Sequence, residues 1–231
     1  MNNLIDTHLH LDCCRNHQEM YKKINESKQY TLCVTNTPEA FERCISFYSE
    51  TKYVKFALGF NPQCVGKAKF DSFKFMKNIK KTRYMGEVGL DFTKPYVQYK
   101  EEQIKIFNFI CKIAANNNKI MSVHSRGAEK EVLEILERNN VKNAIIHWYT
   151  GDIRLIEKFI KAGYYFSINL RMMEKINIRK YIPSERILTE TDFPFNGTKK
   201  NYEKYILEIY QKINCTKEEI YINFYNLLRS N

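Results

Sequence analysis

The sequence predicts an α/β protein built as a single (β/α)₈ TIM-type barrel, and three observations support this fold class. Short apolar or β-branched runs recur eight times along the chain. Most gaps between them hold amphipathic helical patterns; one such face carries Ile104, Phe107, Ile110, Cys111 and Ala114. The length of 231 residues falls within the range of one such barrel. A doubly wound open sheet is the competing arrangement, and the strand count favours the barrel.

The predicted elements alternate from one end of the chain to the other. Strands are expected at residues 4–5, 30–34, 53–58, 84–85, 120–123, 144–146, 164–168 and 187–188. Further helical patterns lie at 132–136 and 153–160, and two more helices close the chain at 202–213 and 220–228. Thr216 and Glu219 have the spacing of a capping box at the start of the last helix. Because no long linker or internal repeat interrupts this order, we expect residues 1–231 to form one domain.

Composition excludes several classes of protein. Hydrophobic residues make up 44% and charged residues 27%, which argues against disorder, and no apolar run approaches the length of a membrane span. Seven cysteines without a CxxC pair fit neither a disulfide framework nor a cysteine-ligated zinc site. We therefore expect a cytoplasmic protein with no membrane partner. The formal charge of +11 favours polyanionic partners, nucleic acid among them.

Four of the five histidines lie at the ends of predicted strands: His8, His10, His124 and His147. His8 and His10 are separated by one residue, so the two-residue period of a strand turns both side chains to the same side. Such a pair alone is weak evidence, because neighbouring histidines often only hydrogen-bond. In a barrel, however, the C-terminal ends of all strands meet at one face and build the active site there. The joint placement therefore indicates metal binding.

Two carboxylates follow the same rule, Glu87 after the fourth predicted strand and Asp192 after the eighth. Either one alone could be a surface charge or a helix N-cap. Four imidazoles and two carboxylates exceed what one tetrahedral ion needs, but they suit two divalent ions that share a carboxylate, with Glu87 as the bridge. We expect two ions (Zn, Mn or Mg), and mixed imidazole and carboxylate donors suit zinc, manganese or iron better than magnesium alone. Asp91 and Asp12 are candidates for holding the second ring nitrogens of the imidazoles, or are exposed loop aspartates.

Five stretches of the chain, taken together, resemble the TatD family of metal-dependent hydrolases, within the wider amidohydrolase-like barrels. They are residues 5–12, 86–92, 123–126, 147–151 and 188–194. The resemblance implies a DNase, often a 3′ to 5′ exonuclease, with His8, His10, Glu87 and Asp192 around one metal and Glu87, His124 and His147 around the other. Residues 35–38 and 57–63 and the Trp-Tyr pair after His147 are more similar to the short QatD branch. That branch belongs to the four-component Qat anti-phage systems, which implies a role in antiviral defence and Qat proteins as partners.

Three further residues are candidates for substrate binding: Asn61, Arg126 and Trp148. Asn61 departs from the family, which usually has Gly-x-His-Pro after the third strand; an amide can donate to a phosphate oxygen but cannot act as an acid. Arg126 can bind a phosphate in bidentate fashion, or equally form a salt link at the start of a helix. Trp148 can stack on an unpaired base, although core packing is the slightly stronger interpretation.

The predicted function is hydrolysis of a phosphodiester bond by a water activated between two metals. Asp192 is the expected general base and Glu87 the bridging catalytic carboxylate, and the substrate is expected to be single-stranded DNA or a 3′ end. Two alternatives stay open. The same centre could hydrolyse a C–N or ester bond, for example in aminoacyl-tRNA deacylation. The chain could also be a weakly catalytic subunit of a defence complex, which Asn61 favours.

Overall fold

The computed structural model describes residues 4–175, 180–194 and 201–230, and its eight strands are parallel and lie in chain order around one sheet. They are β1 (Ile5–Leu9), β2 (Tyr30–Cys33), β3 (Val54–Leu58), β4 (Tyr84–Gly89), β5 (Ile120–His124), β6 (Asn143–His147), β7 (Tyr165–Ile168) and β8 (Ile187–Thr189). A backbone bridge between Leu9 and Phe193 joins the two ends of the sheet. The sheet is thus a nearly closed barrel, which confirms the predicted fold class, and the open doubly wound alternative is wrong.

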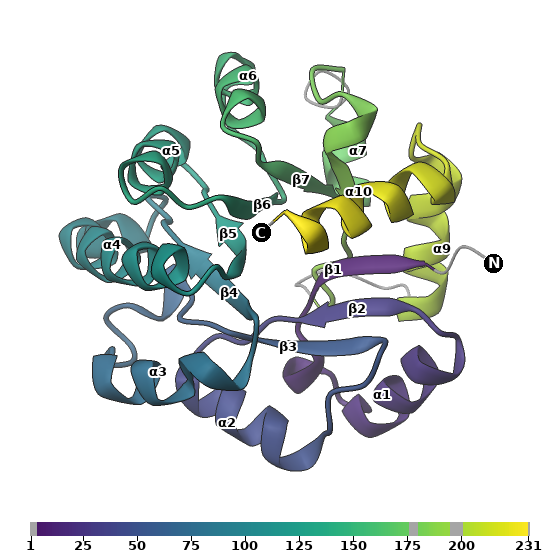
Figure 1. The fold of residues 1–231 in the computed structure, drawn as a ribbon, viewed down its shortest axis with the longest axis horizontal. Coiled ribbons are helices and arrows are strands. Elements are labelled where there is room, and N and C mark those ends of the chain that lie inside the picture. The colour runs from purple at the N-terminus through teal and green to yellow at the C-terminus, as the bar shows by residue number, and fades with distance from the viewer. Residues whose placement is uncertain (1–3, 176–179, 195–200, 231) are drawn as a thin grey trace.

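Helices surround the strands on the outside (Figure 1). They are α1 (His17–Glu26), α2 (Pro38–Phe47), α3 (Ser72–Asn78), α4 (Lys100–Asn116), α5 (Glu129–Arg138), α6 (Ile153–Lys161), α7 (Leu170–Glu174), α9 (Tyr202–Lys212) and α10 (Lys217–Arg229). None of the helices in the described residues is long and apolar enough to cross a membrane.

The last helix, α10, lies across one end of the barrel (Figure 1). Its start is the predicted capping box, in which Thr216 and Glu219 exchange hydrogen bonds. Near its middle, the buried Asn223 donates to the carbonyl oxygens of Ser184 and Ile187, which precede or begin β8. Helix α10 therefore covers the N-terminal ends of the strands and leaves the C-terminal ends open.

Helix α4 shows how a helix positions a loop at that open end. Phe107 and Ile110 of the predicted apolar face are fully buried, whereas Ile104 is only half-buried. The position that turns inward instead is Gln103, which is 1% exposed. Its side chain accepts from the backbone N–H of Asp91 and donates to the Asp91 carbonyl oxygen. This pair of bonds fixes the chain just after β4.

The seam between β8 and β1 is built on a buried carboxylate. Asp6 accepts hydrogen bonds from both the backbone N–H and the hydroxyl of Thr191. Burial raises the pKa of Asp6 to about 7, and the bonds from Thr191 oppose that rise. Next to it, the backbone N–H of Asp192 donates to the carbonyl oxygen of His8 at 2.8 Å. The seam therefore brings His8 and Asp192 side by side.

Two strand pairs are irregular at the positions of predicted metal ligands. The register of β1 against β2 shifts between Asp6 and Leu9, and that of β4 against β5 shifts between Met85 and Val88. The first interval contains His8 and the second contains Glu87, and such bulges re-aim side chains next to active sites. The placement of Glu87 after the fourth strand was wrong, because β4 continues past it to Gly89, which pairs with His124.

Candidate metal centre

All six predicted ligands meet at the C-terminal end of the barrel, in two groups. In the first group, Nε2 of His8 and Nε2 of His10 lie 3.4 Å apart. Asp192 Oδ1 lies 3.5 Å from the His8 nitrogen and 3.6 Å from the His10 nitrogen. Glu87 Oε2 completes the group at 3.3 Å from His10 Nε2 and 3.9 Å from His8 Nε2. The donor atoms of His8, His10 and Asp192 thus lie within 4.8 Å of one another, and Glu87 adds an oxygen within 3.9 Å of both histidines.

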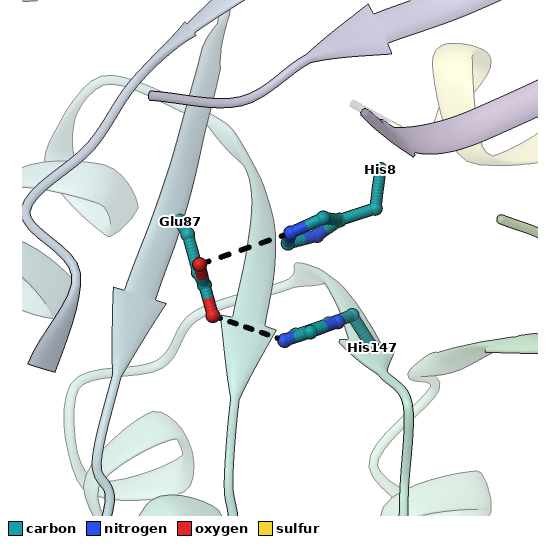
Figure 2. A group of neighbouring side chains, drawn as sticks. All are labelled: His8, Glu87 and His147. Atoms are coloured by element: carbon teal, nitrogen blue, oxygen red, sulfur yellow. Dashed lines mark hydrogen bonds and ion pairs between the residues drawn. The ribbon is translucent and has the colours of Figure 1, made fainter. Parts of the chain in front are cut away.

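The second group uses the other oxygen of the same carboxylate. Glu87 Oε1 lies 2.8 Å from Nδ1 of His124 and 3.1 Å from Nε2 of His147, and these two nitrogens are 3.2 Å apart. Figure 2 shows Glu87 facing both His8 and His147, whose rings stack with centroids 3.9 Å apart. Glu87 therefore lies between the two groups and is the only residue of the six that presents one oxygen to each.

Three histidines are oriented through their remaining ring nitrogens. His8 Nδ1 lies 2.8 Å from the hydroxyl of Ser122, and His124 Nε2 lies 3.0 Å from Asp91 Oδ2. His147 Nδ1 faces Oε2 of the fully buried Glu190 at 3.6 Å. Such partners fix which ring nitrogen is free to bind a metal. The structure thus bears out the contact expected of Asp91, while Asp12 Oδ1 has no hydrogen-bond partner among the described residues.

Charge in the centre is balanced by these contacts. Burial would raise the pKa of Glu87, but hydrogen bonds from His10, His124 and His147 hold it well below its usual range. Burial and the neighbouring His147 hold the pKa of His8 well below its usual value. Burial raises the pKa of Asp192 to about 7, against the opposing effect of His147 and His10. The buried anion at Glu87 therefore requires positive charge beside it, from protons on imidazoles or from cations.

The donor atoms fit divalent ions. Two imidazole nitrogens that face each other at 3.4 Å, as in His8 and His10, can share a cation more readily than a single proton. With bonds of about 2.0–2.1 Å, two ligands of a tetrahedral zinc ion lie roughly 3.3 Å apart, close to the separations within both groups. Imidazole and carboxylate together match zinc and manganese.

Two of the five non-glycine residues that the structure describes with a positive φ lie at the same place. Trp148 follows β6 with φ at 40°, and Asp192 follows β8 with φ at 52°. The left-handed region is uncommon for residues other than glycine, and a bulky side chain there is a clear outlier. Such strain persists only where surrounding contacts enforce it, and it clusters at active sites. Trp148 directly follows the predicted ligand His147, and Asp192, three residues after the end of β8, is itself a predicted ligand.

A cavity of about 540 Å³ opens above the centre. Its lining includes the predicted residues Arg126 and Trp148, together with Arg171 in α7 and Lys175 just after it. Arg171 lies over the ring of Trp148 at 5.8 Å. The sequence analysis missed these two cations, and their only signal is a four-residue spacing shortly after the seventh predicted strand.

Three amide side chains also line the cavity: Asn36, Gln63 and the predicted residue Asn61. Asn61 is already hydrogen-bonded within the protein. Its Nδ2 donates to Glu87 Oε2 at 2.5 Å and to Asn36 Oδ1 at 2.8 Å. Both hydrogens of the amide are thus in use within the protein. The predicted contact between Asn61 and substrate stays a prediction, and it would require the amide to release one of these partners.

Comparison with known proteins gives consistent matches to this arrangement. A family model described as TatD related DNase matches residues 5–231. An uncharacterized metal-dependent hydrolase from Buchnera aphidicola is 28% identical over 210 residues, which cover 83% of this chain and 78% of that protein. Human deoxyribonuclease TATDN3 is 31% identical over 122 residues, which cover 50% of this chain and 44% of that protein.

Solved structures agree on the fold. The TatD homolog YJJV from Escherichia coli superposes with a TM-score of 0.80 at 20% identity and covers 98% of this chain and 97% of its own. A TatD family hydrolase from Entamoeba histolytica gives a TM-score of 0.77 at 17% identity, with 97% of both chains covered. At these identities the likeness establishes the barrel alone.

Proposed function

The chain belongs to the TatD related DNase family of metal-dependent hydrolases, and from that premise we propose that it cleaves phosphodiester bonds of DNA with two divalent ions. The observation that carries the proposal is the position of Glu87. One of its oxygens faces His8 and His10, and the other faces His124 and His147. A carboxylate shared between two groups of ligands is the arrangement that a two-metal site requires.

The six ligands divide between the two ions as follows. His8, His10 and Asp192 with Glu87 Oε2 would hold one ion, and His124 and His147 with Glu87 Oε1 would hold the other. Bound ions would lower the pKa of water and stabilise charge on the scissile phosphate. Asp192 has 16% of its side chain exposed, so it can orient the attacking water and accept its proton.

The cavity suits a nucleic acid. Arg126, Arg171 and Lys175 line the cavity and supply positive charge, and Trp148 lines it as well, with Arg171 5.8 Å from the centre of its ring. Backbone phosphates bind such cations, and unpaired bases stack on aromatic rings without regard to sequence. We take single-stranded DNA, entered at a 3′ end, as the substrate.

The first test is cleavage of end-labelled single-stranded DNA by the metal-stripped protein after Mg²⁺, Mn²⁺ or Zn²⁺ is restored. We expect metal-dependent products that are lost in Asp192→Asn. Asp71→Asn is a matched control, because Asp71 caps α3 at the surface and asparagine caps as well as aspartate. Nucleotides released from the 3′ end first would support the exonuclease polarity.

A lack of products from protein shown to contain metal would overturn the proposal. Turnover of an amide, ester or aminoacyl-tRNA panel by the same preparation would then favour C–N or ester hydrolysis. The DNA and carbonyl substrates should be assayed in parallel, with the same metal and the same Asp192→Asn variant, so that one active site accounts for either result.

The place of this nuclease in anti-phage defence is a further part of the proposal, and it rests on the sequence details shared with QatD. We expect a cytoplasmic protein that acts with the other Qat components. The test is phage protection in cells that carry those components with wild-type or Asp192→Asn protein. Loss of protection in the variant supports a catalytic role in defence, whereas unchanged protection would point to a scaffolding subunit.

A further inference from the structure

A short turn after β3 sends two amide side chains toward the metal centre. Asn61 precedes the 3₁₀ turn η2 (Pro62–Cys64), and the side chain of Gln63 projects from that turn. Asn61 Nδ2 donates to Glu87 Oε2, and Gln63 Nε2 donates to Asp91 Oδ2 at 2.8 Å. The backbone N–H of Gln63 donates to Asn61 Oδ1 at 2.8 Å. This last bond turns the Asn61 oxygen toward the turn and so leaves its nitrogen facing the carboxylate.

These bonds close into a ring through the second group of ligands. Asp91 Oδ2 lies 3.0 Å from His124 Nε2, and His124 Nδ1 lies 2.8 Å from Glu87 Oε1. The ring therefore runs from Asn61 to Glu87, His124, Asp91 and Gln63 and back to Asn61. Apart from the half-buried Gln63, its members are at most 9% exposed. All of its members except Asp91 also line the cavity, so the ring lies directly beside that space.

We infer that Gln63 is a positioning residue that sets the metal affinity of the group formed by Glu87, His124 and His147, and that Asn61 positions the shared Glu87 through Oε2, the oxygen that faces His8 and His10. This inference rests on the proposed two-metal function. Gln63 holds Asp91, which in turn holds the ring of His124, and Asn61 holds Glu87 directly. Both are amides, which donate at any pH, so they keep both carboxylates in place without a proton of their own to lose.

The effect of Gln63 should be confined to that group. His8 is held by Ser122, and Asp192 is held through its backbone N–H on the carbonyl oxygen of His8. Neither contact passes through the turn after β3. Without the Gln63 amide, the bonds that the described residues make to the Asp91 carboxylate are those from Thr93, both on Oδ1, and the contact of Oδ2 with the ring of His124. Oδ2 is then less firmly fixed, and so is the ring that it holds.

Metal binding to the stripped protein, followed by titration calorimetry with Zn²⁺ and with Mn²⁺, tests the inference. Gln63→Glu has nearly the same shape but offers Asp91 a carboxylate in place of a donor. We expect wild type to bind two ions, and the variant to bind one of them roughly 10–100-fold more weakly. Gln98→Glu is the matched control, because Gln98 is exposed and its side chain donates to the carbonyl oxygen of Pro95, within the same loop.

Position 61 supplies a rescue test with the same readout. Asn61→Asp sets a carboxylate against Glu87 Oε2 and should weaken the ion held by His8, His10 and Asp192, whereas Asn61→His retains an N–H donor and should restore much of that affinity. Gln63→Ala, which introduces no charge, replaces Gln63→Glu if the latter fails to fold.

The outcomes distinguish a failure of the proposed two-metal function from a failure of the role inferred for Gln63. A wild-type protein that binds fewer than two ions refutes the proposed two-metal function. A wild type that binds two ions, with both affinities unchanged in Gln63→Glu, refutes this inference alone. Equal weakening of both ions, together with a lower melting temperature of the metal-stripped variant, would also refute it, because it would show a general loss of structure.

Discussion

Removing the charge of Glu87 tests whether one carboxylate serves two ions. Its two oxygens lie 2.8 Å from His124 Nδ1 and 3.3 Å from His10 Nε2, one on each side. In Glu87→Gln one oxygen becomes an amide nitrogen, which donates instead of accepting. One group then loses a ligand atom and both lose negative charge. Asp192→Asn, in contrast, changes only the group that contains His8 and His10.

The size of the expected change in stability follows from the linkage between metal binding and folding. An ion that binds only the folded chain stabilises it by about 2.7 kcal/mol at a free concentration one hundred times its Kd, so two ions contribute about 5 kcal/mol. In chains of about 150–250 residues each kcal/mol shifts the Tm by about 2–4 °C, so metal should raise the Tm by roughly 10–20 °C. We expect Asp192→Asn to retain about half of this shift and Glu87→Gln to lose most of it.

Thermal unfolding followed by circular dichroism, with and without a chelator, measures these shifts. Glu218→Gln is a suitable control, because Glu218 is exposed in the first turn of α10 and far from the ligands in the fold. A Glu87→Gln variant with the full metal-induced shift would refute the shared carboxylate. A larger loss in Asp192→Asn than in Glu87→Gln would refute the division of the ligands.

Four other changes have definite expected outcomes. Trp148→Ala should weaken binding of single-stranded DNA by about 1–3 kcal/mol in a fluorescence titration, with Trp148→Phe close to wild type; equal binding by all three would exclude stacking. Lys175→Ala should reduce the slope of log K against log salt by about 0.7, and an unchanged slope would exclude a phosphate contact. Glu190→Gln should reduce DNA cleavage roughly 10–100-fold by releasing His147, and normal turnover would show that the ring needs no partner. Gly59→Ala should unfold the protein or abolish its expression, because a Cβ there would lie 1.8 Å from the carbonyl oxygen of Thr35; a soluble variant with wild-type Tm would contradict the packing.

The ends of β5 and β6 were predictable from sequence because their signals are local, whereas the apolar runs of the first and fourth predicted strands stop at residues 5 and 85, short of the ends at Leu9 and Gly89. Each of the eight strands contains an apolar run, and His124 and His147 directly end such runs at the positions where β5 and β6 end. The barrel topology then brings these residues together, because the C-terminal ends of all parallel strands lie at one face. That is why six residues from five parts of the chain could be assigned to one centre without coordinates.

The partners of the ligands could not be predicted in this way. Ser122 and Glu190 lie within or next to strands and carry no spacing signal, yet they contact His8 and His147. The register shift that turns Glu87 inward depends on Thr35, which bonds the backbone of Gly86 and Glu87 across the bare Cα of Gly59. Such contacts arise from packing between distant segments, and no pattern within one segment encodes them.

Asn61 shows that contacts hidden from the sequence also change what is expected of catalytic activity. From sequence alone, an asparagine where the family usually has histidine suggests a lost acid and a weaker enzyme. In the structure the side chain donates to Glu87 from within a closed ring of hydrogen bonds. A histidine there would donate to the carboxylate only while the nitrogen that faces it carries a proton, whereas the amide donates at every pH. The substitution therefore preserves the property that the centre depends on, an anionic and fixed Glu87, and the change from histidine is no argument against catalysis.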